Sequence, residues 1–255
     1  MTGVCEVYDP ATDSWENLSA MPSQRVGVVA AVVDNKIYLV DGGSGKTEVY
    51  DPATDLWTEK ASIPSAPYND NGWRGTCVVI DNKIHVIGAF PVSNSHQIYD
   101  PLTDGWTAET PLVSSYWFAM AGATTGVNAP KRIYALGGSN TPTWIGLIDD
   151  LPVSSCQSFD FATGNWTAIP SLPSGRFQVA VGVVDDVVYA IWGWLPSVNN
   201  ARVASVGNEK YVPIGYATVS SDKSSSVTLG MAAVLIASAV AVLIGLIMYF
   251  RKNRK

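Results

Sequence analysis

The sequence is poor in the residues that build redox, metal and hydrolytic centres. Its 255 residues include only three cysteines and two histidines. Cys5, Cys77 and Cys156 are too few for a disulfide framework, and no two of them have C-x-x-C spacing. His85 and His96 are the only imidazoles, and no Ser-His-Asp motif accompanies them. We therefore expect no metal, no cofactor and no enzymatic activity.

Basic residues and phosphate-binding loops are also lacking. Asp and Glu number 22 against 16 Lys and Arg, which gives a net charge of −6. Nucleic-acid-binding proteins carry clustered Lys and Arg, so the composition argues against nucleic acid as a partner. Gly45-Lys46-Thr47 matches the last three residues of a nucleotide-binding loop motif. That motif also requires a glycine five residues earlier, and this position is occupied by Val40. The residues that follow predict a strand closed by proline, not the helix of such a loop, so we expect no nucleotide.

An N-terminal signal peptide is absent, whereas a long apolar run lies near the C-terminus. Residues 1–5 have neither a basic start nor an apolar core. Residues 229–250 contain no charge and no proline, and roughly 20 residues suffice to cross a bilayer. Four basic residues follow at once: Arg251, Lys252, Arg254 and Lys255. Basic residues stay in the cytoplasm, so residues 1–216 are predicted to face outwards.

An outward-facing domain without a signal peptide predicts that the sequence is an N-terminally truncated fragment. The alternative, insertion of the anchor from the C-terminus, would send the basic tail across the membrane against the charge rule. We predict an integral, single-pass membrane protein with a Ser-rich stalk over residues 217–228, a transmembrane helix over 229–250 and a cytoplasmic tail over 251–255.

The chain contains an internal repeat. Four segments align without gaps: VYDPATDSW, VYDPATDLW, IYDPLTDGW and SFDFATGNW. An aromatic residue leads each tryptophan by seven positions, in the pairs Tyr8 and Trp15, Tyr50 and Trp57, Tyr99 and Trp106, and Phe159 and Trp166. Upstream of the last three lie apolar residues followed by glycine, including Gly42-Gly43 and Gly137-Gly138. A fourth such stretch, VYAIWGW, has no tryptophan motif after it.

Each unit is predicted to form four short strands. Tight turns at Asp34-Asn35, Asp81-Asn82 and Asp185-Asp186 join strands one and two. Glycines let the backbone turn after strand two, and the Asp-Pro-x-Thr-Asp segment forms the turn between strands three and four. The tryptophan provides a large apolar side chain that packs between adjacent sheets. Gly45 therefore belongs to a turn between two strands.

Paired glycines, then Tyr and Trp at constant spacing, with a period near 50, resemble kelch repeats of a β-propeller. The resemblance covers residues 3–211 and departs from the pattern at Gly88-Ala89, Trp192-Gly193 and Phe159. It implies an all-β propeller with complete blades at about 25–60, 74–110 and 117–168, and about four to five blades in all. Asn208–Pro213 resembles Thr47–Pro52 and would be a degenerate copy of the third strand. Either residues 3–18 close the ring with the last unit, or upstream blades are missing, and we expect the latter.

A four-stranded meander places its longer connections, between strands two and three and between blades, on one rim. Variable loops on a rigid scaffold usually form the binding face. The candidates on this rim are Tyr68, Asn69, Asp70, Trp73, Tyr116, Trp117, Trp144, Asp149 and Asp150. Arg25, Arg74 and Arg176 precede strand one in register, where they could meet an anionic group in the central channel or bond to backbone between blades.

These features predict a membrane-anchored propeller that binds a protein or glycan by its loop rim, since Trp- and Tyr-rich loops suit both ligands. One alternative is a carbohydrate-active enzyme of the propeller class, an epimerase or hydrolase, in which Asp149 and Asp150 would act. A further alternative is a structural protein of the cell surface. Fold alone does not decide between them.

Overall fold

The structure, a computed structural model, describes residues 3–24, 27–41, 45–64, 75–88, 94–115, 117–140, 151–198 and 201–217. Within these ranges the chain forms nineteen β-strands and no helix. No helix long and apolar enough to cross a membrane occurs there. The predicted stalk, span and tail lie outside the described residues, apart from Ala217.

The strands form a four-bladed, propeller-like arrangement with two additional hairpins. The first complete blade has β3 (Val28–Val33), β4 (Lys36–Asp41), β5 (Thr47–Asp51) and β6 (Leu56–Lys60). The second has β7 (Thr76–Ile80), β8 (Lys83–Ile87), β9 (His96–Asp100) and β10 (Gly105–Ala108). The third has β11 (Met120–Ala123), β12 (Arg132–Leu136), β13 (Cys156–Asp160) and β14 (Asn165–Ile169). The fourth has three strands, β15 (Ala180–Val184), β16 (Val187–Ile191) and β19 (Asn208–Tyr211).

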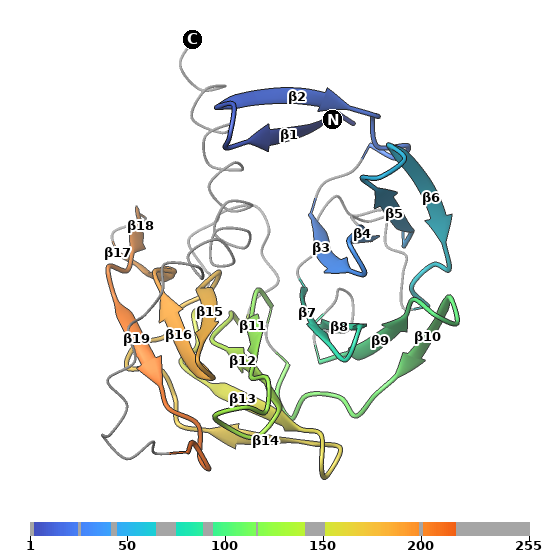
Figure 1. The fold of residues 1–255 in the computed structure, drawn as a ribbon. Coiled ribbons are helices and arrows are strands. Elements are labelled where there is room, and N and C mark those ends of the chain that lie inside the picture. Colours follow the sequence, from blue (N-terminus) through green and yellow to red (C-terminus); the bar gives the residue numbers. More distant parts are fainter. Residues whose placement is uncertain are drawn as a thin grey trace, which may run out of the picture.

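The two hairpins lie outside the four blades. They are β1 (Cys5–Asp9) with β2 (Ser14–Leu18), and β17 (Trp194–Val198) with β18 (Ala201–Ala204). The first hairpin corresponds to strands three and four of a blade, and β1 pairs only with β2 among the described strands. Residues 3–18 therefore do not close the ring with the last unit in this structure. Figure 1 shows the hairpin next to the β3–β6 blade, at the other end of the arc from β15, β16 and β19.

All blades are antiparallel meanders that run outwards from a common centre. The innermost strands β3, β7, β11 and β15 contact their neighbours in series, and the outer strands face away from the centre (Figure 1). Apolar clusters fill the spaces between successive blades. The predicted all-β propeller is confirmed at this level.

The turns between strands one and two follow from the Asp-Asn and Asp-Asp dipeptides. Both residues of each predicted pair have positive φ, for example 49° at Asp34 and 58° at Asn35. Two successive positive φ values define a type I′ turn, whose twist matches that of the strands it joins. Asp55 and Asp104, which end the turns between strands three and four, are also left-handed, at 55° and 49°. In the third blade glycine takes this position, at Gly164.

The repeated aromatic pairs are cross-strand neighbours. Tyr50 is directly opposite Trp57 and the ring centroids are 5.0 Å apart; Tyr99 and Trp106 are 5.1 Å apart. Tyr50 donates a hydrogen bond to Asp55 at 2.7 Å, and burial together with this bond raises the pKa of Tyr50 to about 12. The constant seven-residue spacing therefore reflects a fixed register across each outer hairpin.

In the third blade two substitutions coincide at this motif. Phe159 takes the place of tyrosine and Gly164 takes the place of the aspartate that would accept the hydroxyl. Phe159 packs on Trp166 at 5.5 Å. Losing donor and acceptor together leaves no buried carboxylate or hydroxyl unpaired, so the blade keeps its fold.

Candidate functional site

The strand order fixes which connections share a rim. The strand one–two and three–four connections of the four blades lie on one rim, here called the turn rim: β3–β4, β5–β6, β7–β8, β9–β10, β11–β12, β13–β14 and β15–β16. The connections β4–β5, β8–β9, β12–β13 and β16–β19, and those between blades, lie on the opposite rim, here called the loop rim. The β17–β18 hairpin is part of the β16–β19 connection, so it belongs to the loop rim.

Most of the predicted rim and channel residues lie outside the described part of the chain. These are Tyr68, Asn69, Asp70, Trp73, Tyr116, Trp144, Asp149 and Asp150, together with Arg25, Arg74, Gly42 and Gly43. Trp117, Arg176, Gly137 and Gly138 are described. The binding role of the first group stays a prediction.

Trp117 lies at the base of the longest predicted loop. Its N–H donates to the Ser139 carbonyl at 2.9 Å, and the Ser139 N–H donates back to Trp117 at 2.7 Å. Asn140 donates to the Leu151 carbonyl at 3.1 Å, so the residues on either side of 141–150 are hydrogen-bonded to each other. The described residues that flank 141–150 therefore form a closed base on the loop rim, next to the partly buried Trp117.

Arg176 is fully buried at the entry to β15. Its guanidinium donates to the Trp192 carbonyl at 3.0 Å, to the Ser205 hydroxyl at 3.2 Å and to the Glu209 carboxylate. A second backbone contact reaches the Gly207 carbonyl at 3.4 Å. Glu209 thus supplies the anionic partner, and the arginine fixes both ends of the connection that carries the β17–β18 hairpin.

A second buried polar cluster joins β8 and β9. His85 Nδ1 and His96 Nε2 are 2.9 Å apart, and both side chains are almost completely buried. Burial lowers the pKa of His85 to about 4 and that of His96 to about 3. Phe159 and Phe161 pack edge-on against this pair. Among the described residues no group of three His, Cys, Asp or Glu could hold a metal ion, and the pair is a packed part of the blade interface.

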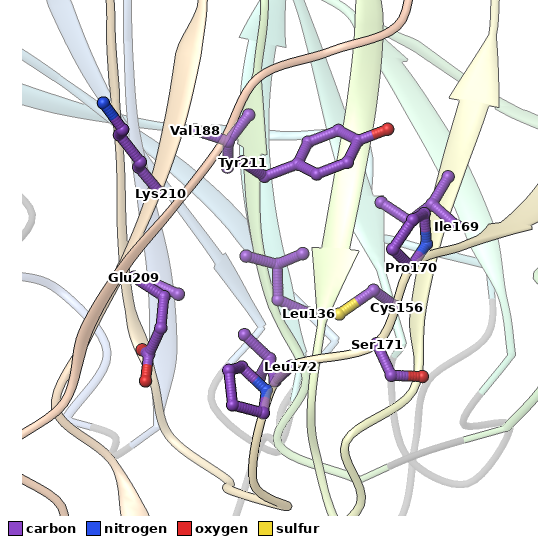
Figure 2. Close-up of a pocket in the computed structure, with 12 residues that line it drawn as sticks. Leu136, Cys156, Ile169, Pro170, Ser171, Leu172, Val188, Glu209, Lys210 and Tyr211 are labelled. Atoms are coloured by element: carbon purple, nitrogen blue, oxygen red, sulfur yellow. The ribbon is translucent and has the colours of Figure 1, made fainter.

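A cleft of about 380 Å³ lies between the third and fourth blades (Figure 2). It is lined by Leu136, Cys156, Ile169, Pro170, Ser171, Leu172, Pro173, Val188, Ala190, Glu209, Lys210 and Tyr211. Figure 2 shows Leu136, Cys156 and Leu172 on one side, with Tyr211 and Val188 across from them. Burial raises the pKa of the Cys156 thiol, so the thiol stays neutral. The cleft therefore has apolar walls, and the two charged side chains come from β19.

A repeated polar position in strand three was not among the sequence predictions. Glu48, Gln97, Gln157 and Glu209 each precede the strand-three aromatic by two residues. Glu48 accepts from the Ser23 hydroxyl at 2.6 Å, and Gln157 bonds the Ser114 backbone at 3.1 and 3.0 Å. These two side chains thus anchor the segment that enters strand one. The signal was present in the aligned repeats as a recurring carboxylate or carboxamide.

The sequence matches no protein-family model and no curated protein. Among solved structures, one titled "Structure of YjhT" is similar with a TM-score of 0.64 and 14% sequence identity. The match covers 82% of this chain and 76% of that chain. At this identity the likeness shows the fold, which is the propeller type.

Proposed function

We propose that this protein is a binding module that recognises a protein or glycan through the loop rim of a kelch-type propeller. One observation supports the proposal. The connections on the loop rim of the complete blades are longer than the two- and four-residue turns opposite, with the eight-residue β11–β12 connection as the exception on the turn rim, and the residues that flank 141–150 are joined by the Asn140–Leu151 hydrogen bond. A rigid scaffold that presents long loops on one face is the usual design of a binding surface.

The kelch assignment rests on the aligned glycines and on the aromatic pairs in fixed register, at 5.3, 5.0, 5.1 and 5.5 Å between ring centroids. The apolar residues 229–250 support a membrane anchor, and the basic residues after them support an outward-facing propeller with a cytoplasmic C-terminus. Neither part of this proposal requires a metal, a cofactor, a nucleotide or nucleic acid.

The test is binding of the purified full-length chain to an array of defined saccharides, with Trp144→Ala and Trp73→Ala compared with the control Leu102→Ala. Leu102 is 89% exposed and lies in the β9–β10 turn on the turn rim. The proposal expects the loop-rim variants to weaken binding at least about tenfold and the control to leave it unchanged. Equal losses from both rims would contradict the rim assignment. No saccharide binding would direct the proposal to a protein ligand.

The alternative of a propeller-class epimerase or hydrolase is distinguished by turnover. Asp149→Asn and Asp150→Asn would abolish product formation without changing the unfolding temperature if either carboxylate acts in catalysis. The binding proposal expects no product formation by the unchanged chain, and therefore no difference in product formation between it and the two variants. A structural surface protein would show lateral assembly at high abundance in place of ligand binding.

A further inference from the structure

Strand-four tryptophans pack against the preceding blade, and two of them, Trp57 and Trp106, also donate a hydrogen bond to it. The strand-four tryptophan of one blade reaches back to the connection that follows the preceding blade's strand four. Trp57 Nε1 donates to the Ser19 carbonyl at 2.8 Å, and Trp106 Nε1 donates to the Ala61 carbonyl at 2.8 Å. In both cases the acceptor lies four residues after the preceding tryptophan of the repeat.

An aliphatic residue of the preceding connection packs near the indoles of Trp106 and Trp166. Ile63 belongs to the cluster that includes Trp106, and Leu112 belongs to the cluster that includes Trp166. Ile63 and Leu112 each lie six residues after the tryptophan of their own blade. At Trp106 the preceding blade thus provides both one carbonyl and one aliphatic side chain. Trp166 keeps the aliphatic contact, whereas its Nε1 is buried without a hydrogen-bond partner among the described residues.

The cleft has residues at the same two positions after the preceding tryptophan, but no indole packs against them among the described residues. Pro170 and Leu172 lie four and six residues after Trp166, and both line the cleft. Across from them is Tyr211, which occupies the strand-three position of Tyr50. Tyr50 stacks on its own tryptophan, whereas the ring that packs on Tyr211 is that of Tyr134, at 5.7 Å.

The strand that would carry the missing tryptophan is also absent among the described residues. β19 is the outer strand of its sheet, and its one partner among the described strands is β16. The chain after β19 does not turn back along it, because Ala217 N–H donates to the Asn128 carbonyl at 2.6 Å. Residues 195–255 contain no tryptophan, so this part of the chain cannot supply an indole.

We propose that the cleft and the free edge of β19 bind an extended, tryptophan-bearing peptide segment of a partner protein. The segment adds to β19 as an antiparallel fourth strand, the mode known as strand addition. Its indole enters the cleft against Leu172 and Tyr211 and donates its N–H to the Pro170 carbonyl. This site lies between blades and is separate from the proposed rim function.

Register and charge define the peptide further. In the complete blades the strand-four tryptophan is opposite the strand-three aromatic, as Trp57 is opposite Tyr50. The residue after the tryptophan is then opposite Lys210, which is exposed. An acidic residue at that position forms a cross-strand ion pair, so the site favours tryptophan followed by Asp or Glu.

A second copy of this chain fits the site less well than a free segment. Trp15 is 61% exposed and is followed by Glu16, so its hairpin carries a suitable sequence. However, the edge of β2 that would have to pair with β19 is already hydrogen-bonded to β1. The other edge of β2 could face β19 only if the hairpin were rotated by half a turn about the strand axis. That rotation also exchanges the two faces of the strand, so Trp15 would point away from the cleft.

The test uses a fluorescently labelled synthetic peptide with the sequence of residues 11–19, ATDSWENLS, and fluorescence polarisation with the full-length chain in detergent. The expected result is saturable binding that weakens at least about tenfold when the peptide's tryptophan is replaced by alanine. Replacing the glutamate after it by lysine weakens binding by a smaller factor. Leu172→Asp in the protein removes binding, and the control Leu102→Asp does not.

If Leu172→Asp fails to fold, the peptide pair still decides the question on the unchanged protein. Equal binding of the tryptophan and alanine peptides, or no binding of either, overturns the proposal. A concentration-dependent dimer that Trp15→Ala abolishes also overturns it, because a second copy would then occupy the cleft.

Discussion

A buried carboxylate that joins the third and fourth blades provides a quantitative test of this structure. Asp186, in the β15–β16 turn, is 2% exposed. Its Oδ1 accepts from the Thr125 N–H at 2.6 Å and hydroxyl at 2.9 Å, and its Oδ2 accepts from the N–H groups of Val127, Asn128 and Ala129 at 3.0, 2.7 and 3.1 Å. Burial alone would raise the pKa of Asp186, but these hydrogen bonds outweigh it and the pKa is lowered.

The substitution Asp186→Asn keeps the shape and removes the charge. An amide can still accept three N–H groups with its oxygen, but its NH₂ must then face the Thr125 N–H. One unsatisfied buried donor costs about 1–3 kcal/mol, and each remaining bond loses its charge assistance, so we expect a loss of about 3 kcal/mol. For a domain of this size that corresponds to about 6–12 °C in Tm.

The assay is thermal and urea unfolding of both chains at pH 7, with Asp185→Asn as the matched control. Asp185 is the exposed neighbour in the same turn, with φ of 50° against 60° at Asp186. The control should lose less than about 0.5 kcal/mol, as exposed substitutions do. Because the pKa of Asp186 is lowered, its contribution is fully present above the ordinary aspartate pKa of about 4 and declines as pH falls further. Equal stability of the two variants would refute this account of the turn.

Two further predictions concern buried groups. The folded protein keeps His85 and His96 neutral while the unfolded chain protonates them near pH 6.5, so stability should fall as pH drops from 6.5 towards 4. At about 1.4 kcal/mol per pKa unit, His85 alone accounts for about 3 kcal/mol over that range, measured by urea unfolding; an unchanged midpoint between pH 7 and pH 5 would contradict it. A Cβ on Gly137 would lie 2.3 Å from the Arg176 carbonyl, whereas one on Gly164 meets nothing within 4 Å, although both have positive φ. Gly137→Ala should therefore lose about 1–3 kcal/mol more than Gly164→Ala in the same assay, and equal losses would show that the close approach is relieved by relaxation.

The repeat could be predicted from the sequence because its signals are local. Seven-residue spacing between Tyr50 and Trp57 reflects a hairpin register, and a dipeptide such as Asp34-Asn35 encodes a turn whatever the rest of the chain does. The blade count at the C-terminal end was harder to predict. β19 has no Pro-x-Thr-Asp turn and no tryptophan after it, so its assignment depended on the short match around Tyr211.

The cleft and the surroundings of Arg176 could not be predicted, because they depend on contacts between distant segments. Arg176 meets Ser205 and Glu209, and its partners follow a connection that contains an inserted hairpin. The cleft lies where the contact of a strand-four tryptophan with the preceding blade is missing. Repeat spacing identifies contacts that recur, so it does not reveal a missing one. Aligning the residues four and six positions after each tryptophan would have shown that Pro170 and Leu172 correspond to Ala61 and Ile63, although no tryptophan of the repeat follows them.

The loop-rim proposal is tested most directly by photo-crosslinking in intact cells, which captures a ligand whatever its identity. A photoreactive phenylalanine analogue is placed at position 144 in one chain and at position 102, in the β9–β10 turn on the turn rim, in another. The account predicts a discrete crosslinked species from position 144 and none from position 102. Crosslinking from position 102 with none from position 144 would contradict it.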